Sequence, residues 1–275
     1  MGVLLGAAGG SRPARRFPEG ADNGRGPRVS ASLRRRALAE AVGSAALVAV
    51  VVGSGIQAAE LSRDVGVQLL ANSLATVFGL GVLITLLGPV SGAHFNPVVT
   101  LAAWFTDRRE GDGLAARDVA AYVPAQIAGA IAGAVLADAM FGTSLVWWST
   151  HDRSAGHLLL GELVATAGLV LLIFGLARVG RAHVAPIAVA SYIGAAYWFT
   201  SSTSFANPAV TIGRTFTNTF AGIAPGSVAP FIAAQTVGAV LGLALMAAVF
   251  GRPAPARADA PAVHDGPELT APTLP

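Results

Sequence analysis

The chain has 275 residues, of which 53% are hydrophobic and only 12% are charged, with a formal net charge of +3. Soluble domains carry about a quarter charged residues, so this composition favours a membrane protein. The chain has no cysteine, which excludes disulfides, and its arginines lie mostly in tails and loops, which gives no reason to expect a nucleic-acid partner.

Hydropathy predicts six membrane-spanning helices of about 20 residues each, the length that crosses a bilayer. We place them at 36–57, 66–88, 119–141, 157–177, 184–201 and 228–250. Residues 1–35 are rich in Gly, Arg and Pro and residues 251–275 in Pro and Ala, so both are expected to be disordered tails. The folded domain, in contact with membrane lipid, is therefore expected over 36–250.

All 18 basic residues are arginines, and their placement predicts the orientation, because cytoplasmic segments carry an excess of basic residues. Fifteen lie in the two tails, between spans two and three, or between spans four and five. The other side holds only Arg63, Arg153 and Arg214. We therefore expect both termini in the cytoplasm and the protein in the plasma membrane.

The chain contains an internal repeat. Three landmarks of the first half recur in the same order in the second: Glu40, Asn96-Pro97 and Gln126 match Glu162, Asn207-Pro208 and Gln235. The separations are 122, 111 and 109 residues, so the halves, about 36–141 and 157–250, are related but differ in loop length. Each half has three spans, so the second must be inverted, which places a functional site near the midplane.

Each Asn-Pro pair predicts the start of a helix, because asparagine is a strong N-cap and proline is favoured at the first helical position. A helix of about ten residues is roughly 15 Å long, half the hydrocarbon thickness. Two such half-helices, meeting at their N-termini, would together span the bilayer. Their positive ends would repel cations, and the side-chain amides of Asn96 and Asn207 would donate to a neutral solute.

The segments "SGAHFNPVVT" and "SFANPAVT", with the paired glutamates and two Gln-x-x-Gly motifs, resemble the aquaporin and glycerol-facilitator family over about 36–250. The resemblance implies an all-α membrane fold of six transmembrane helices plus two re-entrant half-helices in an inverted repeat. It also implies a homotetramer with one pore per subunit and no cofactor. The second box, Pro208-Ala209, follows the family pattern, whereas Val98 after Pro97 replaces the usual alanine.

In the family, the matching glutamates brace the loop backbone, and we expect the same of Glu40 and Glu162, with Gln126 and Gln235 as supports. As buried ionisable residues, the glutamates could instead serve a proton-coupled transporter. His94 matches a position that faces the cytoplasmic half of the pore, although it could equally be a hydrogen bonder at the helix start.

The narrowest ring of the family has four positions. Counting from the boxes gives Thr76, Ser204 and Val210, the last replacing the usual arginine. For the fourth position, counting forward from Pro186 gives Tyr197 and counting back from Asn207 gives Ala195; we prefer Tyr197, because loops accommodate deletions more easily than helices. Arg214, one turn after Val210, either supplies a displaced charge at the pore mouth or extends to the membrane interface.

The sequence therefore predicts a passive channel for water or small neutral solutes, among them glycerol and metalloid acids such as arsenous acid. The alternative is a secondary transporter, which also uses inverted repeats and broken helices. An enzyme is not expected, since the chain shows no cluster of nucleophile, base and orienting group.

Overall fold

The structure, a computed structural model, describes residues 31–110 and 113–251, and within these ranges it contains helices but no strands. The helices are α1 (Leu33–Leu61), α2 (Val65–Ser91), α3 (Pro97–Glu110), α4 (Ala116–Met140), α5 (Gly156–Arg178), α6 (Ala185–Phe199), α7 (Pro208–Gly213) and α8 (Pro225–Phe250), with 3₁₀ turns η1 (Ala182–Val184) and η2 (Arg214–Phe216).

Each of the six predicted spans coincides with one helix, and the ends agree to within about four residues. Because α1 begins at Leu33, residues 33–35 form its first turn, and their prediction as tail was wrong. Residues 1–30 and 252–275 of the predicted tails lie outside the described residues. Among the described helices, five are long and apolar enough to cross a membrane; α6, with 15 residues, is shorter and is preceded by η1.

Both Asn-Pro boxes begin helices at the proline, at Pro97 and Pro208. Their lengths differ from the predicted ten residues, because α3 has 14 and α7 only six. The helix α7 ends early because its last turn tightens into η2, where the backbone N–H of Arg214 bonds to Val210 O and Ile212 O.

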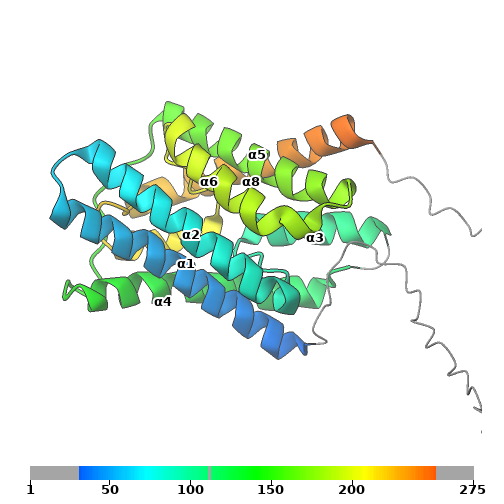
Figure 1. Cartoon of the computed structure of the whole chain (residues 1–275), viewed down its shortest axis with the longest axis horizontal. Helices are drawn as coiled ribbons and strands as arrows, with labels where there is room; N and C mark the ends of the chain where they lie inside the picture. The colour runs from blue at the N-terminus through cyan, green and yellow to red at the C-terminus, as the bar shows by residue number, and fades with distance from the viewer. Residues whose placement is uncertain (1–30, 111–112, 252–275) are drawn as a thin grey trace, which may run out of the picture.

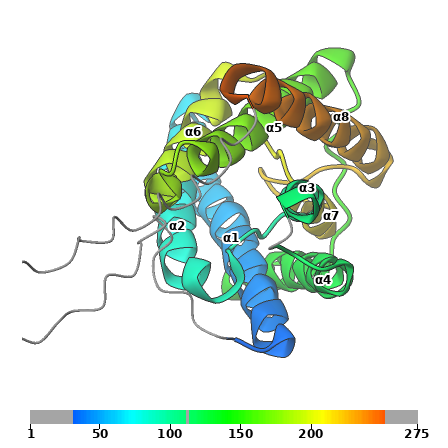
Figure 2. The same cartoon turned by 90° about the vertical axis from the view of Figure 1, so that its right-hand side faces the viewer.

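The long helices enclose the two short ones, as Figure 2 shows for α3 and α7. The first described turn of α1 and the last turn of α8 lie at the same end of the bundle (Figure 1). The packing repeats: α1 lies along α4, and α5 lies along α8. A Cβ on Gly129 would lie 2.2 Å from Ala41 O, and one on Gly238 would lie 2.5 Å from Leu163 O, so both contacts require glycine.

The segments that lead into the two boxes share an unusual backbone. Ala93 and Phe95 have φ of 49° and 48°, and Ser204 and Ala206, at the matching positions, have φ of 53° and 47°. This left-handed region costs a non-glycine residue about 1–2 kcal/mol. Hydrogen bonds from elsewhere in the fold must therefore hold these segments in place.

Candidate functional site

The two asparagines of the boxes are bonded to each other's segments. Asn96 Oδ1 accepts from the N–H of Val98 and caps α3, while its Nδ2 donates to Ala206 O at 2.8 Å. Asn207 Oδ1 accepts from the N–H of Ala209, while its Nδ2 donates to Phe95 O at 2.7 Å. An amide nitrogen carries two protons, so each asparagine keeps a second N–H after these bonds.

Glu40 holds the segment before the first box. Its Oε1 accepts from Ser91 Oγ at 2.6 Å and from the N–H of His94 at 3.0 Å. Its Oε2 accepts from the N–H of Phe95 at 2.7 Å and from Gln126 Nε2 at 2.8 Å. All four bonds fix backbone or supporting groups, so this fully buried carboxylate stabilises the strained loop.

Glu162 does the same in the second half. It accepts from the N–H groups of Phe205 and Ala206, both at 2.8 Å, and from Gln235 Nε2 at 2.6 Å. Gln235 Nε2 also donates to Thr211 Oγ1 at 2.9 Å. Equivalent contacts in the two halves therefore hold both boxes.

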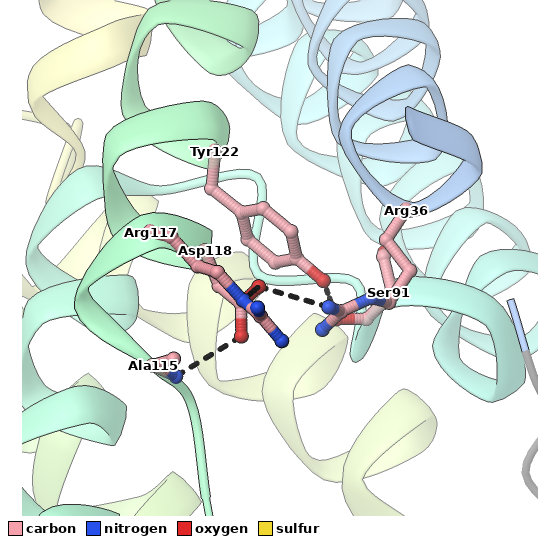
Figure 3. A network of polar contacts seen from close by, with 6 residues as sticks. All are labelled: Arg36, Ser91, Ala115, Arg117, Asp118 and Tyr122. Carbon is pink, nitrogen blue, oxygen red and sulfur yellow. Dashed lines mark hydrogen bonds and ion pairs between the residues drawn. The ribbon is translucent and has the colours of Figure 1, made fainter. Parts of the chain in front are cut away.

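A polar network links the first turns of α1 and α4 to Ser91, as Figure 3 shows. Arg36 forms an ion pair of 2.9 Å with Asp118, whose other carboxylate oxygen accepts from the N–H of Ala115. The guanidinium of Arg36 also lies 5.9 Å from the centroid of the Tyr122 ring, and Tyr122 OH donates to Ser91 O. Since Ser91 Oγ bonds to Glu40, the starts of α1 and α4 are linked to the brace of the first box.

A cavity of about 460 Å³ lies between the helices, within the range of small-molecule sites. It extends from Thr106 and Arg178 near one end to Val210 and Arg214 near the other. All eight residues predicted to line or flank a pore line it: Thr76, His94, Asn96, Tyr197, Ser204, Asn207, Val210 and Arg214. Residues that were selected by their distance from the two boxes therefore line one and the same cavity.

The remaining predicted residues do not line this cavity. Val98 packs in an apolar cluster with Val170 and Phe174, so the departure from the family box is accommodated away from the cavity. The four predicted braces are fully buried and do not line the cavity: Glu40, Gln126, Glu162 and Gln235. Ala195, the alternative at the fourth ring position, is exposed on the outside of α6.

Thr76 on α2 and Tyr197 on the neighbouring α6 are in hydrogen-bond contact on the cavity wall, with Thr76 Oγ1 3.1 Å from Tyr197 OH. Thr76 Oγ1 already donates its proton to Asn72 O, so Tyr197 is the donor in the bond between the two hydroxyls. The phenolic oxygen of Tyr197 therefore retains acceptor capacity. Ser204, three residues before Asn207, has a hydroxyl without a hydrogen-bond partner in the described part of the chain.

His94 lies partly buried beside the first box. Its Nδ1 is 3.1 Å from Thr100 Oγ1, and its ring packs edge-to-face on Tyr122. His94 thus lies on the cavity wall and is also in hydrogen-bond contact with α3. The two alternatives predicted for it, pore lining and a hydrogen bond at the start of the helix, are both compatible with this position.

Arg214 is buried and does not extend to a membrane interface. Its guanidinium carbon lies 3.4 Å from the centroid of the Phe205 ring, and its Nε donates to Ala221 O. Phe205 was not predicted as a site residue, although its place between Ser204 and the second box was a signal. Asp138, which was not predicted either, accepts from Thr217 Oγ1 and so anchors the segment that follows Arg214.

Comparisons with known proteins agree with this geometry. The family model described as "Major intrinsic protein" matches residues 28–205. The aquaglyceroporin AqpS of Rhizobium meliloti (strain 1021) is 52% identical over 214 residues, which cover 78% of this chain and 89% of that protein. The propanediol uptake facilitator PduF of Citrobacter freundii is 31% identical over 130 residues, 46% of this chain and 45% of that protein.

Among solved structures, the X-ray structure of the aquaglyceroporin from Plasmodium falciparum matches with a TM-score of 0.55. The identity is 19%, and the match covers 77% of this chain and 95% of that chain, which supports the same fold. The family match and the AqpS relative together establish that the chain belongs to the major intrinsic protein family, and that it is a membrane channel and not an enzyme.

Proposed function

We propose that the protein is a passive channel that conducts water and neutral solutes of the size of glycerol, and that Thr76, Tyr197, Ser204 and Val210 form its narrowest ring. The unpartnered hydroxyl of Ser204 carries this proposal, since it is 4% exposed and lines the cavity. A buried hydroxyl without a partner is costly unless a passing molecule bonds to it.

The composition of the ring fits a polyol. Tyr197 and Ser204 offer hydroxyls, whereas Val210 offers an apolar wall. Glycerol likewise has a hydroxyl edge and a hydrocarbon edge. Because valine is shorter than arginine, the opening is wider than in relatives with arginine at this position, which also suits trihydroxy metalloid acids such as arsenous acid.

Exclusion of ions follows from the two boxes. The N-terminus of α3 and the spare N–H groups of Asn96 and Asn207 present positive potential and donors to the centre of the pore. Such a lining favours neutral acceptors over protons and metal cations.

A secondary transporter is disfavoured by the position of its candidate charges. Glu40 and Glu162 do not line the cavity, and both oxygens of each carboxylate accept hydrogen bonds from the chain itself. A coupling carboxylate must instead exchange protons with the transport path.

We further propose a homotetramer in the plasma membrane with both termini cytoplasmic. The excess of arginine in the tails and in two loops supports this orientation, as does the common position of the two described chain ends in Figure 1. Exposed apolar side chains on the outer face of α2, among them Phe78 and Val82, suit contact with lipid.

Stopped-flow permeability of proteoliposomes to water, glycerol, urea and arsenous acid tests the function. We expect conduction that persists with a protonophore, and a several-fold loss of glycerol permeability in Ser204→Ala. Ser201→Ala is the matched control, because Ser201 is exposed and does not line the cavity. Uptake that collapses with the proton gradient while the solute gradient persists would establish the transporter instead.

A further inference from the structure

Two arginines share the ring of Phe205 at the end of the cavity near Val210, here called the outer mouth. Arg214 and Phe205 line the cavity, whereas Arg153 lies outside its lining. The guanidinium carbon of Arg214 lies 3.4 Å from the centroid of Phe205, and that of Arg153 lies 5.1 Å from the same centroid. Both distances are within the range of cation–π contact. Arg153 comes from the loop between α4 and α5, so two distant segments bring like charges together.

Neighbouring backbone carbonyls hold the two side chains in place. Arg214 Nε donates to Ala221 O, and Arg153 Nε donates to Gly222 O at 2.9 Å. The terminal nitrogens of both guanidiniums donate to no residue in the described ranges. Each arginine is therefore positioned by one N–H and keeps the planar fork of its other N–H groups available.

The charges at the outer mouth are not balanced by ion pairs. Among the described residues, no carboxylate lies within 4.0 Å of either arginine. The only ion pairs in this part of the chain are those of Asp118 with Arg36 and Arg117. Glu162 accepts from the backbone N–H of Phe205 and offsets one charge. The exposed carboxylate of Asp152 accepts from the N–H of Ser154 and from Ser227 Oγ.

His151, the remaining titratable group nearby, does not add a third charge at neutral pH. Burial, together with the charges of Arg153 and Arg214, lowers its pKa below the usual 6.5. Burial likewise lowers the pKa of Arg153. Among the buried and partly buried groups, two guanidiniums and the carboxylate of Glu162 leave one positive charge. Asp152, whose hydrogen bonds lower its pKa, adds a negative charge that is exposed to solvent.

We propose that the outer mouth binds one small monovalent oxyanion, of the nitrate or formate type, between Arg153 and Arg214. Guanidinium groups bind planar oxyanions with paired N–H···O bonds, which a spherical ion cannot match. A single bound charge would neutralise the uncompensated cation, and an uncompensated buried charge is strongly unfavourable. This site is separate from the conduction of neutral solutes, since it requires no passage through the ring.

Thermal unfolding of the full-length protein in detergent tests the site without any transport measurement. Sodium nitrate is titrated while sodium chloride, whose spherical anion cannot form paired N–H···O bonds, keeps the ionic strength constant. A ligand that binds only the folded state raises the midpoint with a saturable dependence, by about 3–5 °C at ten times its dissociation constant. The variants are Arg153→Gln, which removes the charge, and Arg153→Lys, which keeps it without the planar fork.

Arg63→Ala is the matched control, because Arg63 is an exposed arginine predicted on the same side of the membrane. We expect the wild type and Arg63→Ala to show equal shifts, Arg153→Gln to show none, and Arg153→Lys to need at least fivefold more nitrate for half of the shift. A wild type without a saturable shift, or a shift unchanged in either Arg153 variant, would overturn the proposal.

Discussion

Asn96 donates its side-chain amide to the carbonyl oxygen of Ala206 at 2.8 Å, across 110 residues of sequence. The matching bond, from Asn207 to Phe95 O, runs in the opposite direction. The two boxes are therefore parts of one hydrogen-bonded unit, and a change in one asparagine acts on the loop of the other half.

Replacement of this donor should damage conduction. In Asn207→Asp the carboxylate keeps the cap on α7 but faces Phe95 O with an oxygen, which loses a buried bond and costs about 1–3 kcal/mol. We expect glycerol permeability to fall at least tenfold and cation leak to rise. Proteoliposome fluxes at matched protein density measure both, and an inserted variant with wild-type fluxes would contradict the central position of Asn207.

Arginine at position 210 should make the ring more selective for water over glycerol. Val210→Arg narrows the opening and adds a cation with several donors, so glycerol should slow about tenfold more than water does. Val210→Leu is the control for size without charge. The glycerol-to-water permeability ratio is the measurement, and an unchanged ratio would remove Val210 from the ring. A fall of the ratio in Arg214→Ala would place the constriction one turn further out.

The hydroxyl of Tyr197 should matter more than that of its neighbour on α6. Tyr197→Phe removes the bond to Thr76 and an acceptor from the cavity, so glycerol permeability should fall several-fold. Tyr192→Phe makes the same chemical change where the hydroxyl bonds to Ala165 O, away from the cavity. Equal losses in both variants would show that helix packing, and not the ring, explains the effect.

The braces should govern stability. Glu162→Gln leaves one acceptor oxygen and turns an NH₂ group toward the N–H donors of the loop, which should cost about 3 kcal/mol. In thermal unfolding in detergent this corresponds to a midpoint lowered by about 10 °C. Glu60→Gln, at an exposed glutamate, should leave the midpoint within 1 °C or so. A stable Glu162→Gln protein would refute the brace.

The spans and the boxes were predictable because each follows from a local rule. Hydropathy fixes the spans, and Asn-Pro combines an N-cap with the preferred first helical residue, so the starts of α3 and α7 at Pro97 and Pro208 followed directly. The choice between Tyr197 and Ala195 depended on where a loop is shorter, which a single sequence does not contain; the cavity contains Tyr197.

Contacts between distant segments were not predictable. The position of Arg214 over Phe205 depends on Ala221 O, and that of Arg153 depends on Gly222 O, neither of which has a sequence signature. The unequal lengths of α3 and α7 likewise depend on the turn at η2. The position that matches Asp138 in the second half is Ala247. A comparison of the two halves therefore gave no reason to select Asp138.

The exchange of bonds between the boxes has a consequence for how the protein is made. Phe95 O receives its donor from Asn207, which the ribosome adds 112 residues later, on the order of ten seconds at typical elongation rates. Until then the first box lies in a bilayer that offers its carbonyl no water. The first half therefore has to wait at the translocation machinery, or in contact with interfacial water, and the two halves complete each other as the last step of biogenesis.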